Sequence, residues 1–161
     1  MRETKEMDGR LMETNYKEYY QDQLNQSLEF QDFVAENFVK LMGIAITNFG
    51  SRKYQHSTGE NVQGIEIKYD KKFCDTGNLY IETHEKSHPD NLEYVLSGIY
   101  RLDNSWCYVV GNYDIVYMLA KSHLKLMDKN HVYRYVTTPT SKGFLLPRDD
   151  ADKYCIKKIT F

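Results

Sequence analysis

Two runs of alternating side chains lie close together in residues 62–86, which read VQGIEIKYDKKFCDTGNLYIETHEK. Apolar and charged residues alternate over residues 62–70, and they alternate again over residues 78–86. Because successive side chains of a strand point to opposite faces, this pattern predicts two half-buried β-strands. The connecting residues 71–77 contain a glycine and read as a turn, so we expect the two strands to form an antiparallel hairpin.

A long helix is expected before this hairpin, over residues 15–42. Its apolar side chains recur at helical spacing between charged ones, and Gly43 follows as a C-terminal cap. Residues 1–15 lack such a stripe, so we expect them to be frayed and residues 16–161 to form one domain. The polar residues 47–61 read as a loop.

Short elements follow the hairpin. Residues 105–110 and 115–119 are expected to form a second antiparallel hairpin, and residues 120–130 a short helix. Further strands are expected at residues 133–136, 143–146 and 156–161, with a helix at residues 148–154. The sequence therefore predicts an α+β domain with a long N-terminal helix, a central and mostly antiparallel sheet that carries the hairpin, and short C-terminal helices.

The polar face of the predicted hairpin carries the residues that can perform chemistry. Glu66 and Lys68 share a face of the first strand, and Glu82, His84 and Lys86 share a face of the second. Paired strands lie about 4.8 Å apart, so Glu66 and Glu82 are expected to bind one divalent cation, Mg²⁺ or Mn²⁺. His84 or Lys68 would then orient or deprotonate a water molecule. This set predicts metal-dependent hydrolysis of phosphodiesters.

The layout resembles that of the PD-(D/E)xK nuclease superfamily, in which an acidic residue precedes an acidic-x-basic triplet. Glu66 matches the first acidic position, and Glu82-Thr83-His84 matches the triplet, with His84 where lysine is usual. Superfamily members often carry a further acid on the first helix, for which Glu36 is a candidate, and Glu60 is another possible match. The resemblance implies a restriction-endonuclease-like fold and a Mg²⁺-dependent endonuclease that cleaves nucleic acid, with DNA as the expected substrate.

The same motif also fits in a second register. Glu66-Ile67-Lys68 is itself an acidic-x-lysine triplet, with Glu60 or Glu36 as the upstream acid. We favour Glu66 with Glu82 because this choice uses both strands. The structural alternative is that the charged side chains of an amphipathic hairpin face water and pair across the strands, each pair contributing well under about 1 kcal/mol.

Charge is unevenly distributed along the chain. The net charge is −2, from 21 basic and 23 acidic residues, which argues against binding nucleic acid by bulk charge. Residues 1–40 carry a net charge of −4 and residues 41–120 carry −3, whereas residues 121–161 carry +5. Phosphate contacts are therefore expected in the last part of the chain.

Three lysines of this basic part recur at helical spacing, namely Lys121, Lys125 and Lys129. They predict one helix face that contacts the phosphate backbone of nucleic acid, and Lys142 and Arg148 would extend that surface. The alternative is an ordinary solvated face of a helix.

The remaining composition points to a globular domain in the cytoplasm. Hydrophobic residues make up 41% of the 161 residues and charged residues 27%, which excludes disordered and fibrous classes. The three cysteines form no CxxC pair and read as reduced thiols, and no apolar run is long enough to span a membrane. A homodimer is expected only by analogy with nucleases that cut two strands.

A second hypothesis assigns the chain to a different functional class. It is a catalytically inactive protein that keeps the nuclease fold and binds a protein partner or nucleic acid, as phage and mobile-element accessory proteins do. The histidine at the position of the motif lysine, His84, favours this hypothesis, and so does the negative net charge. The chain has 14 tyrosines, and the exposed ones among them would then anchor the interface.

Overall fold

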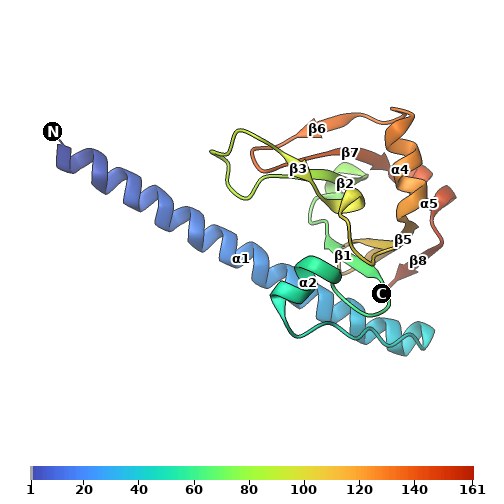
Figure 1. The fold of residues 1–161 in the computed structure, drawn as a ribbon. Helices are drawn as coiled ribbons and strands as arrows, with labels where there is room; N and C mark the ends of the chain where they lie inside the picture. Colours follow the sequence, from blue (N-terminus) through green and yellow to red (C-terminus); the bar gives the residue numbers. More distant parts are fainter. Residues whose placement is uncertain (1) are drawn as a thin grey trace.

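The structure is a computed structural model that describes the backbone of residues 2–161 and the side chains from residue 15 onward. It is an α+β fold built from one long helix, two four-stranded sheets and several short helices (Figure 1). In chain order the elements are α1 (Arg2–Met42), α2 (Arg52–Thr58), β1 (Ile65–Tyr69), α3 (Phe73–Thr76), β2 (Asn78–Glu85), β3 (Val95–Leu96), the 3₁₀ turn η1 (Gly98–Tyr100), β4 (Cys107–Gly111), β5 (Ile115–Ala120), α4 (Lys121–Lys129), β6 (Tyr135–Thr137), β7 (Ser141–Pro147), α5 (Arg148–Tyr154) and β8 (Lys157–Thr160).

The first sheet has the strand order β1-β4-β5-β8 and is covered on one face by α1. Phe30, Val34 and Phe38 of α1 are fully buried, and they form one apolar cluster with Ile65 and Ile67 of β1. The strands β4 and β5 pair in antiparallel fashion, which confirms the second predicted hairpin. The apolar side of β1 therefore faces α1, and its other side is left for Glu66 and Lys68.

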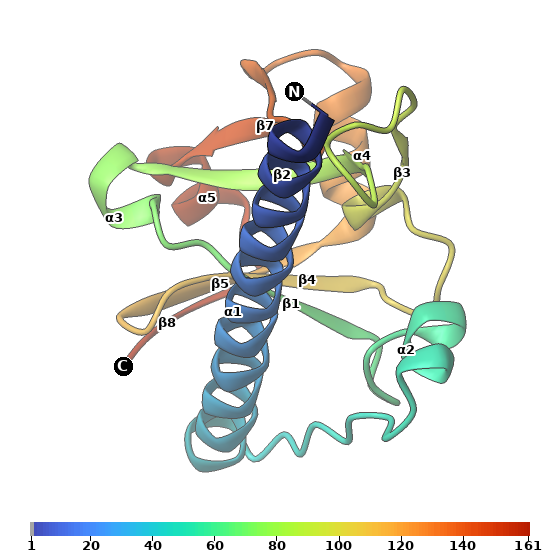
Figure 2. The ribbon, with the colours of Figure 1, turned by 90° about the vertical axis from the view of Figure 1, so that its left-hand side faces the viewer.

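The second sheet has the order β3-β2-β7-β6 and packs on the other face of the first. Leu79 and Ile81 of β2 join Phe144 of β7 in a buried cluster with Tyr108 and Tyr117 of the first sheet. Figure 2 shows α1 crossing in front of both sheets, with β2 running behind it. Tyr16 and Gln23 of α1 line a cavity together with Glu82 of β2.

The expected hairpin between β1 and β2 is wrong. β1 pairs in parallel with β4, and β2 pairs in antiparallel fashion with β7, so the two strands belong to different sheets. The intervening residues form the helical turn α3 rather than a tight turn, and a long connection does not hold its flanking strands in register. Alternation shows which residues share a face, but it carries no information about the neighbouring strand.

Other expectations were met more closely. Gly43 ends α1 with a φ of 66°, as expected for a C-terminal cap, and α5 covers the residues assigned to it. The expected loop at residues 47–61 contains the helix α2, whose first turn is capped by the Ser51 hydroxyl. The expected frayed segment 1–15 falls almost wholly on residues whose side chains lie outside the described part, so the domain boundary stays a prediction. Within residues 2–161, no helix has the length and apolar character needed to cross a membrane.

Candidate active site

The side of β1 that faces away from α1 carries a buried carboxylate. Glu66 is 1% exposed, and its Oε1 lies 3.1 Å from Nζ of Lys68, two residues along the same strand. Lys68 keeps a side-chain exposure of 35%, so its ammonium group connects the buried carboxylate with the surface. The Glu66-Ile67-Lys68 triplet is therefore an ion pair on one strand face.

A second ammonium group reaches Glu66 from the start of α4. Nζ of Lys121 lies 2.6 Å from Oε2 of Glu66 and 3.6 Å from Oδ1 of Asp103, and it also donates a hydrogen bond to Ser105. The lysine is only 3% exposed, so the expected nucleic-acid contact through Lys121 is wrong. The cause is its place directly after β5, where its backbone N–H bonds to Trp106 and its side chain enters the core.

Glu60 approaches the same ion pair from the loop before β1. Its Oε2 accepts a hydrogen bond of 3.1 Å from the backbone N–H of Ile67. Burial raises the pKa of this carboxyl group to about 7, and the negative charge of Glu66 acts in the same direction, whereas the ammonium group of Lys68 lowers it. Glu60 is therefore poised to gain or lose a proton near neutral pH.

Glu82 completes the cluster from the second sheet. It lies on the face of β2 opposite Leu79 and Ile81, and its Oε1 accepts a hydrogen bond of 2.9 Å from the Ser97 hydroxyl. Burial raises the pKa of Glu82, and Lys68 opposes this effect. Glu82 thus feels the charges of Lys68 and Glu66, although it lies in the other sheet.

The 3₁₀ turn η1 holds the backbone of Glu82 in place. Gly98 in this turn has a φ of 52°, and a β-carbon there would lie 2.1 Å from the carbonyl oxygen of Glu82. Only glycine allows this close approach. The neighbouring Ser97 is thereby placed to donate its hydroxyl hydrogen to the Glu82 carboxylate.

Lys68 is the common neighbour of the three carboxylates. Burial lowers its pKa, but the negative charges of Glu66, Glu82 and Glu60 outweigh burial and raise the pKa of Lys68 well above its ordinary value. The ammonium group therefore stays charged throughout the neutral range. We call Glu60, Glu66, Lys68 and Glu82 the carboxylate–lysine cluster.

Two residues expected in the site are placed elsewhere. A β-bulge separates His84 from Glu82, and the imidazole Nδ1 of His84 is hydrogen-bonded to the Thr83 hydroxyl at 2.8 Å. The bulge breaks the two-residue alternation that would have aligned the two side chains. Glu36 lies on the exposed side of α1, whereas Val34 and Phe38 face the sheet. The expected roles of His84 and Glu36 therefore find no support in the geometry.

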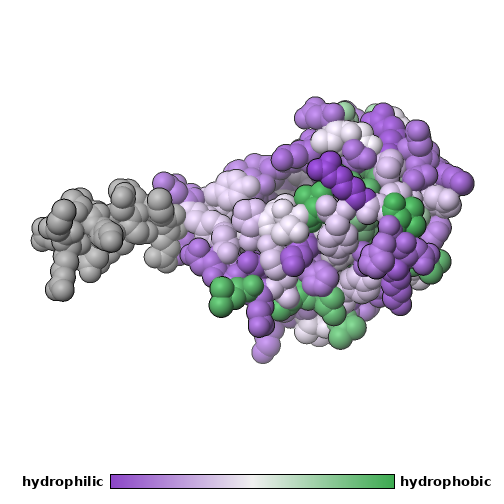
Figure 3. Space-filling view, turned by 90° about the horizontal axis from the view of Figure 1, so that it is seen from above, coloured by the Kyte–Doolittle hydropathy of each residue, from purple (hydrophilic) through white to green (hydrophobic). Residues whose placement is uncertain are grey.

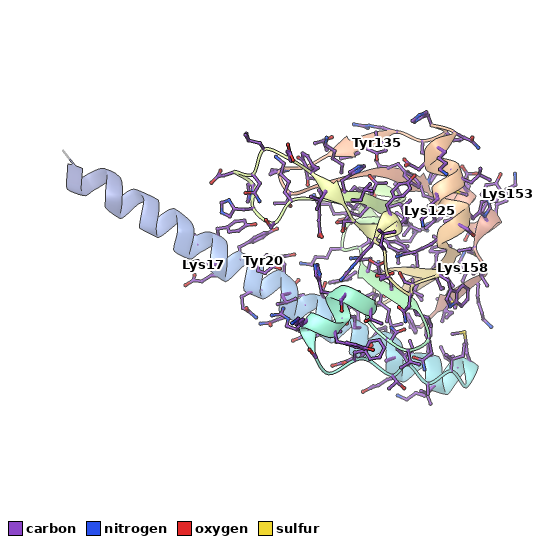
Figure 4. All side chains as sticks on the ribbon, in the orientation of Figure 1. Lys17, Tyr20, Lys125, Tyr135, Lys153 and Lys158 are labelled. Atoms are coloured by element: carbon purple, nitrogen blue, oxygen red, sulfur yellow. The ribbon has the colours of Figure 1, made fainter. Side chains whose placement is uncertain are left out.

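The remaining basic residues lie on several elements, and the single surface expected of them stays a prediction. Lys129 is exposed, and Lys125 (labelled in Figure 4) lies 5.8 Å from the ring of Tyr100. Lys142 stacks on Tyr94 from β7, and Arg148 stacks on Phe73 at the start of α5. These cations come from three elements, α4, β7 and α5. The helical spacing from Lys121 to Lys129 describes α4 alone.

A cavity of about 420 Å³ opens beside the cluster. Lys68 and Glu82 line it, together with Asp70, whose carboxylate accepts backbone N–H groups of Lys72 and Tyr80 at 3.0 and 2.8 Å. Asp70 therefore ties the end of β1 to β2 across the two sheets. Asp70 is spaced as Glu66 and Lys68 are, but the sequence pattern carries no signal for this bridging role.

The donor set suits a hard divalent cation in kind. Neither buried oxygen of Glu66 accepts a well-formed hydrogen bond, and both are contacted only by ammonium groups among the described residues. No three acidic, histidine or cysteine side chains in the described part of the chain converge as a ready-made metal site. Mg²⁺ commonly takes one or two protein carboxylates and completes its shell with water and phosphate oxygens, so Glu66 and Glu82 are ligands of the chemical kind that it takes.

The buried ion pair between Lys121 and Glu66 is expected to stabilise the fold. The Lys121→Met variant leaves part of a buried negative charge uncompensated, and we expect it to lower the free energy of unfolding by about 3 kcal/mol in urea denaturation. Lys129→Met, at the exposed end of the same helix, is the matched control and is expected to cost less than about 1 kcal/mol. Equal losses for the two variants would show that the ion pair is not structural.

The raised pKa of Glu60 predicts a dependence of stability on pH. Between about pH 4.5 and 7 the folded protein retains the Glu60 proton that the unfolded chain has lost, so the free energy of unfolding falls as the pH rises through this window. Glu60→Gln removes this loss, and above pH 7 the variant is expected to be more stable than the wild type by about 2 kcal/mol.

Denaturation with urea at several pH values measures this difference, which should vanish below pH 4.5. Glu36→Gln removes the same formal charge from the exposed side of α1, and it controls for the change in net charge. A stability difference for Glu60→Gln that stayed constant from acid to neutral pH would contradict the raised pKa.

Comparison with known proteins supplies no family for this site. No family model, no curated protein and no solved structure matches the chain. The function is therefore argued from the carboxylate–lysine cluster and its cavity.

Proposed function

We propose that the protein is a metal-dependent phosphodiester hydrolase that cleaves nucleic acid. The observation that carries this proposal is the carboxylate–lysine cluster, in which Lys68 lies among Glu60, Glu66 and Glu82 at the wall of a cavity. Three carboxylates gathered around one ammonium group repel each other, and a divalent cation would relieve that repulsion. Structural charge pairs on an exposed strand face would not need this burial.

Glu66 and Glu82 are the residues that would hold the cation. When bound, a divalent cation neutralises phosphate charge and lowers the pKa of water. The side chain of Glu66 is oriented by Lys121, and that of Glu82 by the Ser97 hydroxyl. Both carboxylates are therefore held in fixed directions before substrate binds.

Lys68 and Glu60 supply the charge and the proton transfer. The Lys68 ammonium group lines the cavity and stays protonated, so it would stabilise the negative charge that develops on the phosphate oxygens. Glu60, with a pKa of about 7, would accept a proton from the attacking water at the oxygen that Ile67 does not occupy. This assignment takes its lysine from the Glu66-Ile67-Lys68 triplet and keeps Glu82 as a ligand of the cation.

DNA as the substrate follows from the sequence resemblance and stays a prediction, as do a cytoplasmic location and a homodimer. The lining of the cavity is an argument about the chemical class of the ligand, and it does not distinguish DNA from RNA. Three lysines line the cavity, namely Lys68, Lys71 and Lys72, and they favour an anionic ligand such as a phosphodiester, although apolar side chains such as Val110 and Leu145 form much of the wall.

A second candidate function is favoured by the position of Lys121. Its buried ammonium group lies 2.6 Å from Glu66 and compensates this carboxylate without any cation. A protein that keeps the fold for binding and does not cleave would gain stability from such a contact. In that reading the cluster is structural, and the partner is another protein or an uncleaved nucleic acid.

Cleavage of a labelled oligonucleotide and of plasmid DNA in Mg²⁺ or Mn²⁺ tests the proposed function. We expect cleavage by the wild type that stops in EDTA, and a loss of about 100-fold or more in Glu82→Gln and in Lys68→Met. His84→Ala is the matched control, because His84 lies on the same strand beyond the bulge, and we expect it to cleave at the wild-type rate.

Two outcomes would count against this account of the site. Absence of cleavage by the wild type beyond the level of Glu82→Gln would favour the non-cleaving protein. A loss of activity in His84→Ala equal to that in Lys68→Met would return the motif to the register that contains Glu82-Thr83-His84.

A further inference from the structure

The cavity beside the cluster is one half of a longer groove. A second cavity of about 720 Å³ adjoins it, and Gln23 of α1 and Glu82 of β2 line both. The first cavity extends toward Lys71 and Lys72 before α3, and the second extends toward His56 of α2. Glu82 therefore lies at the middle of a groove that runs between α1 and β2.

Residues of α1 form one wall of the groove. Residues next to α3 line the first cavity and His56 of α2 lines the second, and Figure 2 shows α3 and α2 on opposite sides of α1. Contacts of α1 bound the groove: Oε1 of Gln23 accepts a hydrogen bond of 2.8 Å from Lys71, and the ring of Tyr16 contacts His88 at 4.7 Å.

Cations and aromatic rings line both cavities of the groove. Three lysines line the first cavity, namely Lys68, Lys71 and Lys72. The second cavity is lined by tyrosines of α1, of which Tyr19 is 62% exposed and Tyr20 is 57% exposed. Figure 4 labels Tyr20 where α1 reaches the body of the domain. Cations that follow a backbone, next to aromatic rings on which bases stack, are typical of sites for single strands.

The acidic residues of the groove do not contradict this assignment. Asp70 uses its carboxylate oxygens to accept backbone N–H groups, and Glu82 belongs to the carboxylate–lysine cluster. Glu85 and Glu93 line the second cavity with Tyr19 and Tyr20, where bases rather than phosphates would be bound. Seen from above, the surface is mostly hydrophilic, with apolar side chains in scattered positions (Figure 3).

We propose that the groove between α1 and β2 binds a single-stranded nucleic acid, with its phosphates on Lys68, Lys71 and Lys72 and its bases on Tyr19 and Tyr20. The strand crosses Glu82 at the middle of the groove, and this inference rests on the proposed function because it names the form of the substrate of that same cluster. Double-stranded nucleic acid is bound only where its strands separate.

Fluorescence anisotropy of a labelled oligothymidylate, measured in EDTA, tests the binding without cleavage. We expect the wild type to bind the single strand at least about tenfold more tightly than a duplex of equal length. The Tyr19→Ala/Tyr20→Ala double variant is expected to lose about tenfold in affinity for the single strand. Tyr54→Ala is the matched control, because Tyr54 is a helix tyrosine with 51% exposure that lines neither cavity, and its affinity should equal that of the wild type.

Three results would overturn the inference. These are absence of binding to the single strand, a duplex that binds as tightly as the single strand, and a loss in Tyr54→Ala equal to that in the double variant. Because the assay contains no divalent cation, single-strand binding without any cleavage in Mg²⁺ or Mn²⁺ would refute the hydrolase and leave the groove assignment intact. The preference of the wild type for the single strand over the duplex is measured without any substitution, so it does not depend on whether a variant folds.

Discussion

The fold is organised around a negative charge that β1 carries into the interior. Glu66 is nearly inaccessible to water, and its two oxygens are held by Lys68 from the same strand and by Lys121 from the start of α4. A buried charge without such partners would cost several kcal/mol, so the placement of α4 after β5 and the exposure of Lys68 to the cavity are both tied to this one carboxylate. Lys68 is the member of the ion pair that lines the cavity, so the pair presents its positive charge there.

Two sheets rather than one hairpin bring the acidic residues together. β1 is covered by α1 on its apolar face and pairs with β4, which turns Glu66 and Lys68 toward the second sheet. There β2 presents Glu82 on the face opposite Leu79 and Ile81, and Asp70 accepts a hydrogen bond from the backbone N–H of Tyr80 and so joins the two strands. The convergence therefore depends on the packing of the sheets, and a change in that packing would move Glu82 relative to Lys68 without altering either strand.

The sequence was informative where a pattern is local and uninformative where a partner is remote. Period-two alternation placed Glu66 with Lys68 and Glu82 opposite Leu79, because side-chain direction depends only on the strand itself. It could not distinguish a hairpin from two separate sheets, and the bulge after Glu82 left no trace that would have removed His84 from the site. Lys121 was assigned to the surface because lysines at helical spacing usually lie in solvent, and its burial depends on Glu66, which is 55 residues earlier in the chain.

The central claim is that Glu66 and Glu82, on separate sheets, hold one divalent cation beside Lys68. Isothermal calorimetry of Mn²⁺ binding tests it most directly, since it requires neither substrate nor cleavage. The account predicts a single class of sites in the wild type that is lost in Glu82→Gln and retained in His84→Ala. Absence of Mn²⁺ binding by the wild type, or binding that Glu82→Gln leaves unchanged, would contradict it and assign the cluster a structural role.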